Sequence, residues 1–226
     1  MNLQTKITLK KETRNPISYN SKIFLFGSCF SENIGSKIEY FKFENTINPF
    51  GILFHPIAIE ILITNIVNEK IYTEKDIFFH NERWHCYEAH SELSNPSKED
   101  LLLKLNAAIS TANTQLKEVS HVIITLGTSW AYRLIETDTV VANCHKVPQK
   151  KFLKELLLID EITNSLEAII TLIKSVNNNI EIIFTVSPVR HLKDGFVENM
   201  RSKSHLLSAI HQVIAPRDHT HYFPSY

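Results

Sequence analysis

Three largely apolar runs divide the chain and predict buried β-strands. They cover residues 23–26, 121–127 and 180–188. The first two are continuously apolar rather than alternating, which indicates that both faces of each strand are covered. This pattern is typical of a parallel sheet.

Apolar residues at helical spacing occupy most of the chain between these runs. Because strands and helices alternate, the sequence predicts a three-layer α/β/α architecture with a mainly parallel sheet, formed by residues 1–226 as a single domain. The predicted helices span residues 31–40, 55–68, 97–117, 160–175 and 197–214, with Ser31 as the cap of the first.

Shorter patterns predict additional extended segments. Residues 41–47, 130–135 and 140–146 are expected to be strands, and residues 1–20 an extended lead-in. The segment 78–86 predicts a small hairpin that turns near Asn81 and Glu82, as an insertion beside the main sheet.

Composition and charge exclude several classes of protein. The 226 residues carry 24 basic and 24 acidic side chains without a long block of one sign, so no nucleic-acid-binding surface is predicted. No apolar run reaches the roughly 18 residues that span a bilayer, and the amino terminus lacks the apolar core of a signal peptide. The sequence therefore predicts a cytoplasmic protein without a membrane span.

The three cysteines, Cys29, Cys86 and Cys144, are widely separated and form no Cys-x-x-Cys pair. This spacing predicts neither a disulfide framework nor a zinc site, and no cofactor is expected. His80, His85 and His90 lie near the predicted hairpin, but a hairpin alternates faces and no carboxylate or cysteine spacing supports a metal site. Structural or surface roles are favoured for these histidines.

The residues Gly27, Ser28 and Cys29 follow the first buried strand and precede a predicted helix. Glycine permits a sharp bend, and free N–H groups at a helix N-terminus favour a thiolate or an oxyanion. Both Ser28 and Cys29 are chemically able to attack a carbonyl. The alternative is purely structural, because small residues often follow buried strands and a free cysteine often packs as a small apolar residue.

Small or polar residues also follow the other two buried strands. Gly127, Thr128 and Ser129 end the second run, and residues 187–191 end the third. Since the carboxyl ends of parallel strands share one edge, these three turns are expected to form one site there.

Six segments resemble the GSCFA family, whose name comes from the motif that appears here as Gly27-Ser28-Cys29-Phe30-Ser31. The resemblance implies a member of the SGNH or GDSL-type hydrolases, with their flavodoxin-like fold. The other five segments are Asn48–Gly51, Leu126–Thr128, Asn143–Lys146, Thr185–His191 and Tyr222–Tyr226.

The superfamily pattern implies a role for each matching position. Alignment on Gly27 places Cys29 at the nucleophile, and a shift of one residue would place Ser28 there. The backbone N–H groups of Cys29 and Gly51 are expected to form the oxyanion hole. In the block that begins at Gly127, Ser129 replaces the usual Asn and offers one hydroxyl donor.

The final superfamily block, Asp-x-x-His, supplies the catalytic base. The resemblance implies that it lies downstream of Tyr226, so the chain is expected to lack its catalytic segment and most of the corresponding rate. The only local match is Asp218-x-x-His221.

Four further residues are candidates for substrate binding. Asn143 and His145 belong to a family motif and are expected to line the pocket, although a loop role remains open for His145. Arg190 can bind an acyl or phosphate oxygen with two hydrogen bonds, and His191 adjoins it; a surface ion pair is the alternative for both.

Two functional hypotheses follow. The first is an acyl-ester hydrolase or acyltransferase that forms a covalent acyl-enzyme on a small-molecule or carbohydrate ester. The second is a non-catalytic module of the same fold that binds a carbohydrate or an acylated ligand. The sequence leaves the oligomeric state open.

Overall fold

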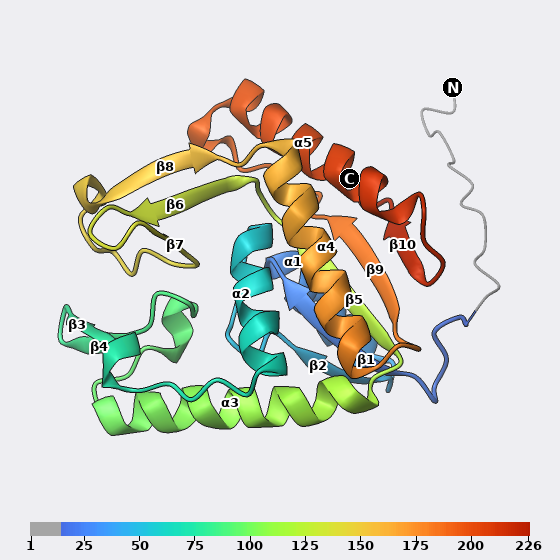
Figure 1. Ribbon diagram of the computed structural model, residues 1–226, viewed down its shortest axis with the longest axis horizontal. Helices are drawn as coiled ribbons and strands as arrows, with labels where there is room; N and C mark the ends of the chain where they lie inside the picture. The colour runs from blue at the N-terminus through green and yellow to red at the C-terminus, as the bar shows by residue number, and fades with distance from the viewer. Residues whose placement is uncertain (1–14) are drawn as a thin grey trace.

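The computed structural model describes residues 15–226, so residues 1–14 of the predicted lead-in lie outside the described part (Figure 1). A five-stranded parallel sheet occupies the centre in the order β10-β9-β5-β1-β2. Its strands are β1 (Lys22–Gly27), β2 (Glu44–Ile47), β5 (His121–Leu126), β9 (Glu181–Val186) and β10 (Thr220–Phe223).

The order of the strands places a topological switch point between β1 and β5. The chain proceeds outward from β1 to β2, and then returns to the other side of β1 to build β5, β9 and β10. In open parallel sheets, ligands bind beyond the carboxyl ends of the strands at such a point. The turn at Gly27 lies there, in register with Thr125 of β5.

Helices cover both faces of this sheet, which confirms the predicted α/β/α architecture. The four helices α2 (Pro56–Val67), α3 (Lys98–Glu118), α4 (Ile159–Val176) and α5 (Phe196–Ile214) share one apolar core with Phe24, Ile124 and Phe184 of the strands. Helix α1 (Cys29–Tyr40) covers the other face (Figure 1). Beside it, Ile123, Ile183 and Phe223 help to line an apolar groove of about 240 Å³.

The first turn of α1 differs from the sequence prediction. Ser28, rather than Ser31, is the N-cap, and its Oγ accepts a hydrogen bond from the Phe30 N–H. Ser31 is buried, and its hydroxyl donates to the Phe26 carbonyl at 2.9 Å. The helix therefore begins at Cys29, immediately after the bend, which places Cys29 among the N–H groups of the first turn.

Two insertions extend beyond the sheet (Figure 1). The predicted hairpin is present as β3 (Phe78–His80) and β4 (Arg83–His85), and Asn81 and Glu82 adopt left-handed conformations at its tip. The second insertion is an antiparallel sheet of β6 (Trp130–Leu134), β7 (Thr139–Val141) and β8 (Phe152–Leu156). The sequence did not predict β8. Strand β7 ends at Val141 rather than at residue 146, since the next N–H, that of Ala142, donates to the Tyr87 carbonyl at 2.8 Å.

Strand β10, which the sequence also did not predict, corrects the role of Asp218 and His221. Thr220 starts β10 and pairs with Ile182 near the amino end of β9. The Nε2 of His221 lies 2.9 Å from a Glu181 carboxylate oxygen. Since Cys29 follows the carboxyl end of β1, the Asp218-x-x-His221 match lies at the opposite end of the sheet and is not a base for Cys29.

No helix within residues 15–226 combines the length and the apolar character needed to traverse a lipid bilayer.

Gly27 allows β1 and β5 to approach closely at the switch point. Its φ is +127°, and a Cβ at this position would lie 2.1 Å from the Thr125 carbonyl oxygen. Neither the conformation nor the distance is compatible with a side chain.

We expect the Gly27→Ala variant to lose about 3 kcal/mol or more of unfolding free energy, because a backbone atom blocks the new methyl group. Gly35→Ala is the matched control. Its Cβ would meet only the Ile47 side chain, which can move, and alanine favours the helix, so its stability should stay within about 1 kcal/mol of the wild type. Urea unfolding measures both, and equal losses would contradict the proposed constraint at Gly27.

Candidate active site

The turn between β1 and α1 presents Cys29 and buries Ser28. The Ser28 N–H donates to the Thr125 carbonyl at 3.1 Å, its Oγ caps α1, and its exposed fraction is 0%. Cys29 is the first residue of α1 and is partly exposed. Of the two predicted nucleophiles, only Cys29 is accessible from solvent.

The Asn48–Gly51 loop braces this turn. Asn48 Oδ1 accepts the Gly27 N–H at 2.9 Å, and the Leu53 N–H donates to the Gly27 carbonyl at 3.0 Å. The Gly51 N–H donates to the Asn48 carbonyl at 2.8 Å within the loop. Gly51 is therefore not the free oxyanion donor that the superfamily pattern implied.

The residues after β5 are also engaged by the protein. The Gly127 N–H donates to the Phe54 carbonyl at 2.7 Å. Ser129 is fully buried, its N–H donates to Ser202 Oγ at 2.8 Å, and its hydroxyl donates to the Ser202 carbonyl at 3.1 Å. Ser129 thus fixes α5 to the end of β5, and its hydroxyl is not directed at a ligand.

Lys203 of α5 is a buried amine at the carboxyl ends of β5 and β9. Its side chain is 1% exposed, and Nζ donates to the Gly127 carbonyl at 2.7 Å and to the Ser187 carbonyl at 2.8 Å. The Tyr226 ring lies 5.5 Å from Nζ. No described carboxylate pairs with Lys203, so burial lowers its pKa to about 8, and the charge of Cys29 acts in the opposite direction.

The sequence analysis missed Lys203, although the buried face of α5 contained a signal. The positions that face the core include Asn199, Ser202 and Lys203 in the first half of the helix and Leu206 and Ile210 in the second. A helical stripe that changes from polar to apolar indicates that one end of the helix contacts a polar site. Here that end meets the turns after β5 and β9.

The Tyr222–Tyr226 segment closes over the same edge of the sheet. After β10, Ser225 Oγ donates to the Val186 carbonyl at 2.6 Å and also contacts Thr185 Oγ1. This anchor on β9 brings Tyr226 to Lys203. The family motif at the end of the chain therefore contributes to the environment of the buried amine.

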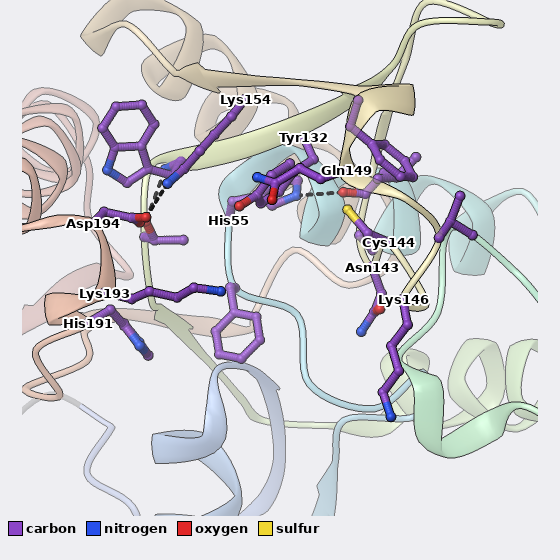
Figure 2. A pocket seen from close by; sticks show the side chains of 17 residues that line it. His55, Tyr132, Asn143, Cys144, Lys146, Gln149, Lys154, His191, Lys193 and Asp194 are labelled. Carbon is purple, nitrogen blue, oxygen red and sulfur yellow. Dashed lines mark hydrogen bonds and ion pairs between the residues drawn. The ribbon is translucent and has the colours of Figure 1, made fainter.

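A cavity of about 510 Å³ lies next to this edge, within the roughly 300–1,000 Å³ typical of small-molecule sites (Figure 2). Figure 2 shows Asn143, Cys144 and Lys146 on one side and His191 and Lys193 on the other. The second insertion supplies the lining residues Trp130, Tyr132, Val141, Phe152 and Lys154.

Phe54 lies between the cavity and the turn that joins β1 to α1. It lines the cavity, and its ring packs against His191 with a centroid distance of 5.9 Å. A Cβ on Gly127 would lie 3.0 Å from the Phe54 ring and 3.3 Å from Ser28 Cβ. Cys29 does not line the cavity, and Gly127 is the residue that separates Phe54 from Ser28.

The four predicted binding residues have different positions. Asn143 lines the cavity, and its Oδ1 accepts the His145 N–H at 2.8 Å. His191 lines the cavity, and burial together with the positive charge of Lys203 lowers its pKa. Arg190 is exposed and lies over the Phe196 ring at 5.6 Å, outside the cavity.

His145 is a buried structural residue rather than a lining residue. Its exposed fraction is 4%, and Nε2 donates to the Cys86 carbonyl at 2.7 Å. Its ring packs against His85, with a centroid distance of 4.7 Å. Burial lowers the pKa of His145 to about 4, so it is neutral at pH 7.

His55, which the sequence analysis did not single out, is the N-cap of α2 and lines the cavity. Its Nδ1 accepts the Ala58 N–H at 3.2 Å and its Nε2 donates to the Val141 carbonyl at 3.1 Å. Acceptance at Nδ1 requires the neutral ring, and burial lowers the pKa of His55 to about 4.

Within residues 15–226, no group of three or more His, Cys, Asp or Glu side chains is arranged to hold a metal ion. His85, a tempting ligand in the sequence, instead contacts Ser94 Oγ at 2.6 Å and the His80 carbonyl at 2.9 Å.

A family model described as the GSCFA family matches residues 22–226, from the start of β1 to Tyr226. The match covers the turn between β1 and α1, Lys203 and the cavity. No curated protein and no solved structure matches the chain.

The low pKa of His55 predicts a loss of stability in acid. In the unfolded chain the imidazole binds a proton near pH 6.5, but the folded protein resists protonation until about pH 4. Its contribution is therefore complete above pH 6.5 and is lost as pH falls from 6.5 through 4, by about 3 kcal/mol.

Urea unfolding between pH 7.5 and 4.5 measures this loss. His55→Asn, which keeps a capping side chain, should flatten the pH dependence, whereas His211→Asn at an exposed position should leave it unchanged. Identical slopes in the wild type and His55→Asn would show that His55 is not the responsible group.

Proposed function

Because the chain belongs to the GSCFA family, we propose that it is an acyl-ester hydrolase or acyltransferase of the SGNH type in which Cys29 forms a covalent acyl-enzyme. The observation that carries this proposal is the buried Lys203 amine, which donates to the Gly127 carbonyl near the turn between β1 and α1. A thiol at a helix N-terminus with a nearby base is the arrangement that nucleophilic catalysis requires.

Cys29 is favoured over Ser28 by accessibility. The Ser28 hydroxyl is fully buried, and its Oγ is turned toward the Phe30 N–H as the cap of α1 rather than toward solvent. Cys29 is partly exposed, and no cap bond depends on its side chain.

Lys203 is suited to accept the thiol proton. A neutral amine has two hydrogens and one lone pair, and the two hydrogens match the Gly127 and Ser187 carbonyls. The lone pair is then left for a proton. With a pKa of about 8, roughly one tenth of the Lys203 side chains are neutral at pH 7, which is a useful fraction for a general base.

The proposed reaction has two balanced steps. The Cys29 sulfur attacks the ester carbonyl while its proton passes to Lys203, and the C–O bond to the alcohol then breaks as Lys203 returns that proton to the departing oxygen. Water or another hydroxyl attacks the resulting thioester, again with Lys203 as base, and the Cys29 thiol is released. The backbone N–H of Cys29 at the start of α1 is the donor proposed for the oxyanion.

The alternative function is a binding module without catalysis. The observation in its favour is that the donors expected from Gly51 and Ser129 are both engaged within the protein. A cavity of about 510 Å³ lined by aromatic and polar side chains would serve binding equally well.

Incubation with an activated ester such as 4-nitrophenyl acetate tests the covalent mechanism. Mass spectrometry of the intact protein should show one added acetyl group, located on Cys29 by peptide mapping. Cys29→Ala should abolish this label and the accompanying nitrophenol burst. Cys86→Ala, which changes a buried cysteine, and Ser28→Ala should keep both.

Ser28→Ala removes a cap and is expected to cost about 1 kcal/mol of stability, so labelling is compared below its unfolding temperature. If the folded protein acquires no acetyl group on Cys29 from esters of several chain lengths, the binding function replaces the enzymatic one.

The pH dependence of acetylation tests the role of Lys203. Since the neutral amine is the active form, the acetylation rate should rise with pH through about 8 and then level. Lys203→Arg keeps a positive charge but cannot act as a base, and should lower the rate at pH 7 by about a hundredfold.

Lys174→Arg is the matched control. Lys174 also donates to backbone carbonyls, those of Asn178 and Ile180, and burial also lowers its pKa, but it lies at the amino end of β9. Thermal unfolding and circular dichroism establish that each variant is folded. If Lys203→Arg retains the wild-type rate and pH profile, Lys203 is not the base, whether or not Cys29 is acylated.

A further inference from the structure

The cavity near the turn between β1 and α1 is lined by more lysine than carboxylate side chains. Its charged lining residues are Lys146, Lys154, Lys193 and Asp194. Asp194 forms an ion pair with Lys154, so these two charges cancel (Figure 2). Neither Lys146 nor Lys193 pairs with a described carboxylate, although the chain as a whole carries equal numbers of basic and acidic residues. Two positive charges are therefore left for a ligand.

Two buried polar atoms of the lining residues also have no partner in the described structure. They are Trp130 Nε1 and His191 Nε2. The indole N–H can only donate, and a neutral imidazole donates from one of its nitrogens. Unsatisfied buried polar atoms are uncommon, and both of these belong to side chains that line the cavity.

The rest of the lining is largely apolar and aromatic. Phe54, Tyr132, Val141 and Phe152 contribute apolar surface, and Lys154 covers one face of Trp130 at 4.8 Å from the ring centroid. Stacking of a neutral sugar on that face of Trp130 is therefore disfavoured. The lining suits an apolar body that carries an anionic group.

We propose that the cavity binds small organic anions, which have an apolar or aromatic body and a carboxylate or phosphate group, and that Lys193 is the residue that selects the charge. Figure 2 shows Lys193 extending from the His191 side toward the middle of the cavity. Lys146 lies on the opposite side and contributes a more distant charge. The identification of this anion as the substrate rests on the proposed function, whereas its binding does not.

Binding is measured in the Cys29→Ala background, so that acylation cannot contribute. The chain has two tryptophans, and Trp84→Phe leaves Trp130 in the cavity wall as the only fluorescent indole. The probes are benzoate, phenyl phosphate and benzamide, which share one ring and differ in charge. We expect saturable changes in Trp130 fluorescence with the two anions and at least about tenfold weaker binding of benzamide.

Substitution of single lysines identifies the group that selects charge. Lys193→Gln should weaken benzoate or phenyl phosphate binding about three- to tenfold and leave benzamide unchanged, because the lysine is exposed and its charge is partly screened. Lys150→Gln is the control, since Lys150 is exposed nearby but does not line the cavity. Raising the salt concentration should reduce anion binding in the wild type more than in Lys193→Gln.

Equal affinity for benzoate and benzamide, or equal losses in Lys193→Gln and Lys150→Gln, would overturn the proposal. A preference for phenyl phosphate over benzoate would identify phosphate as the anionic group, and the reverse preference a carboxylate. Anion binding in Cys29→Ala without any acetylation of the wild type would contradict the proposed catalysis but not this site. Acetylation of Cys29 without selective anion binding would contradict this anion site but not the proposed catalysis.

Discussion

The close contact between the backbones of β1 and β5 at Gly27 is the constraint on which the candidate site depends. A side chain at Gly27 would collide with the Thr125 carbonyl, and the chain bends there into α1 without an intervening loop. The bend buries Ser28 as the helix cap and leaves Cys29 as the first helical residue. Because the Asn48 side-chain oxygen accepts the Gly27 N–H, the bend that precedes Cys29 is held by the β5 backbone and by the Asn48 side chain.

Lys203 connects the stability of the fold to its proposed chemistry. An ammonium group loses hydration when it is buried, and two carbonyl acceptors offset only part of that loss. A larger fraction of the Lys203 amine is therefore neutral near pH 7 than for a lysine in water. The neutral amine still bridges the ends of β5 and β9. The same two hydrogen bonds that hold α5 against the sheet thus orient the amine that we propose as the base.

The second insertion forms one wall of a cavity at the carboxyl ends of the strands. Strands β6, β7 and β8 leave the sheet directly after β5, and their inner residues form one wall, while the loop after β9 supplies His191 and Lys193. Parallel sheets place their strand ends together whatever the loops contain. Loop residues, rather than the sheet, therefore determine which ligand fits.

The sequence by itself determined the α/β/α architecture, the three central strands and the position of Cys29 after the carboxyl end of β1, because long apolar runs and helical spacing are local signals. It could not determine β8 or β10, which are short and partly exposed and gain their stability from pairing with distant strands. Only the tertiary structure decided that Ser129 contacts Ser202 and that Lys203 reaches Gly127, because these pairs lie 73 and 76 residues apart. Such contacts depend on how α5 packs against the sheet, and no local pattern records that packing.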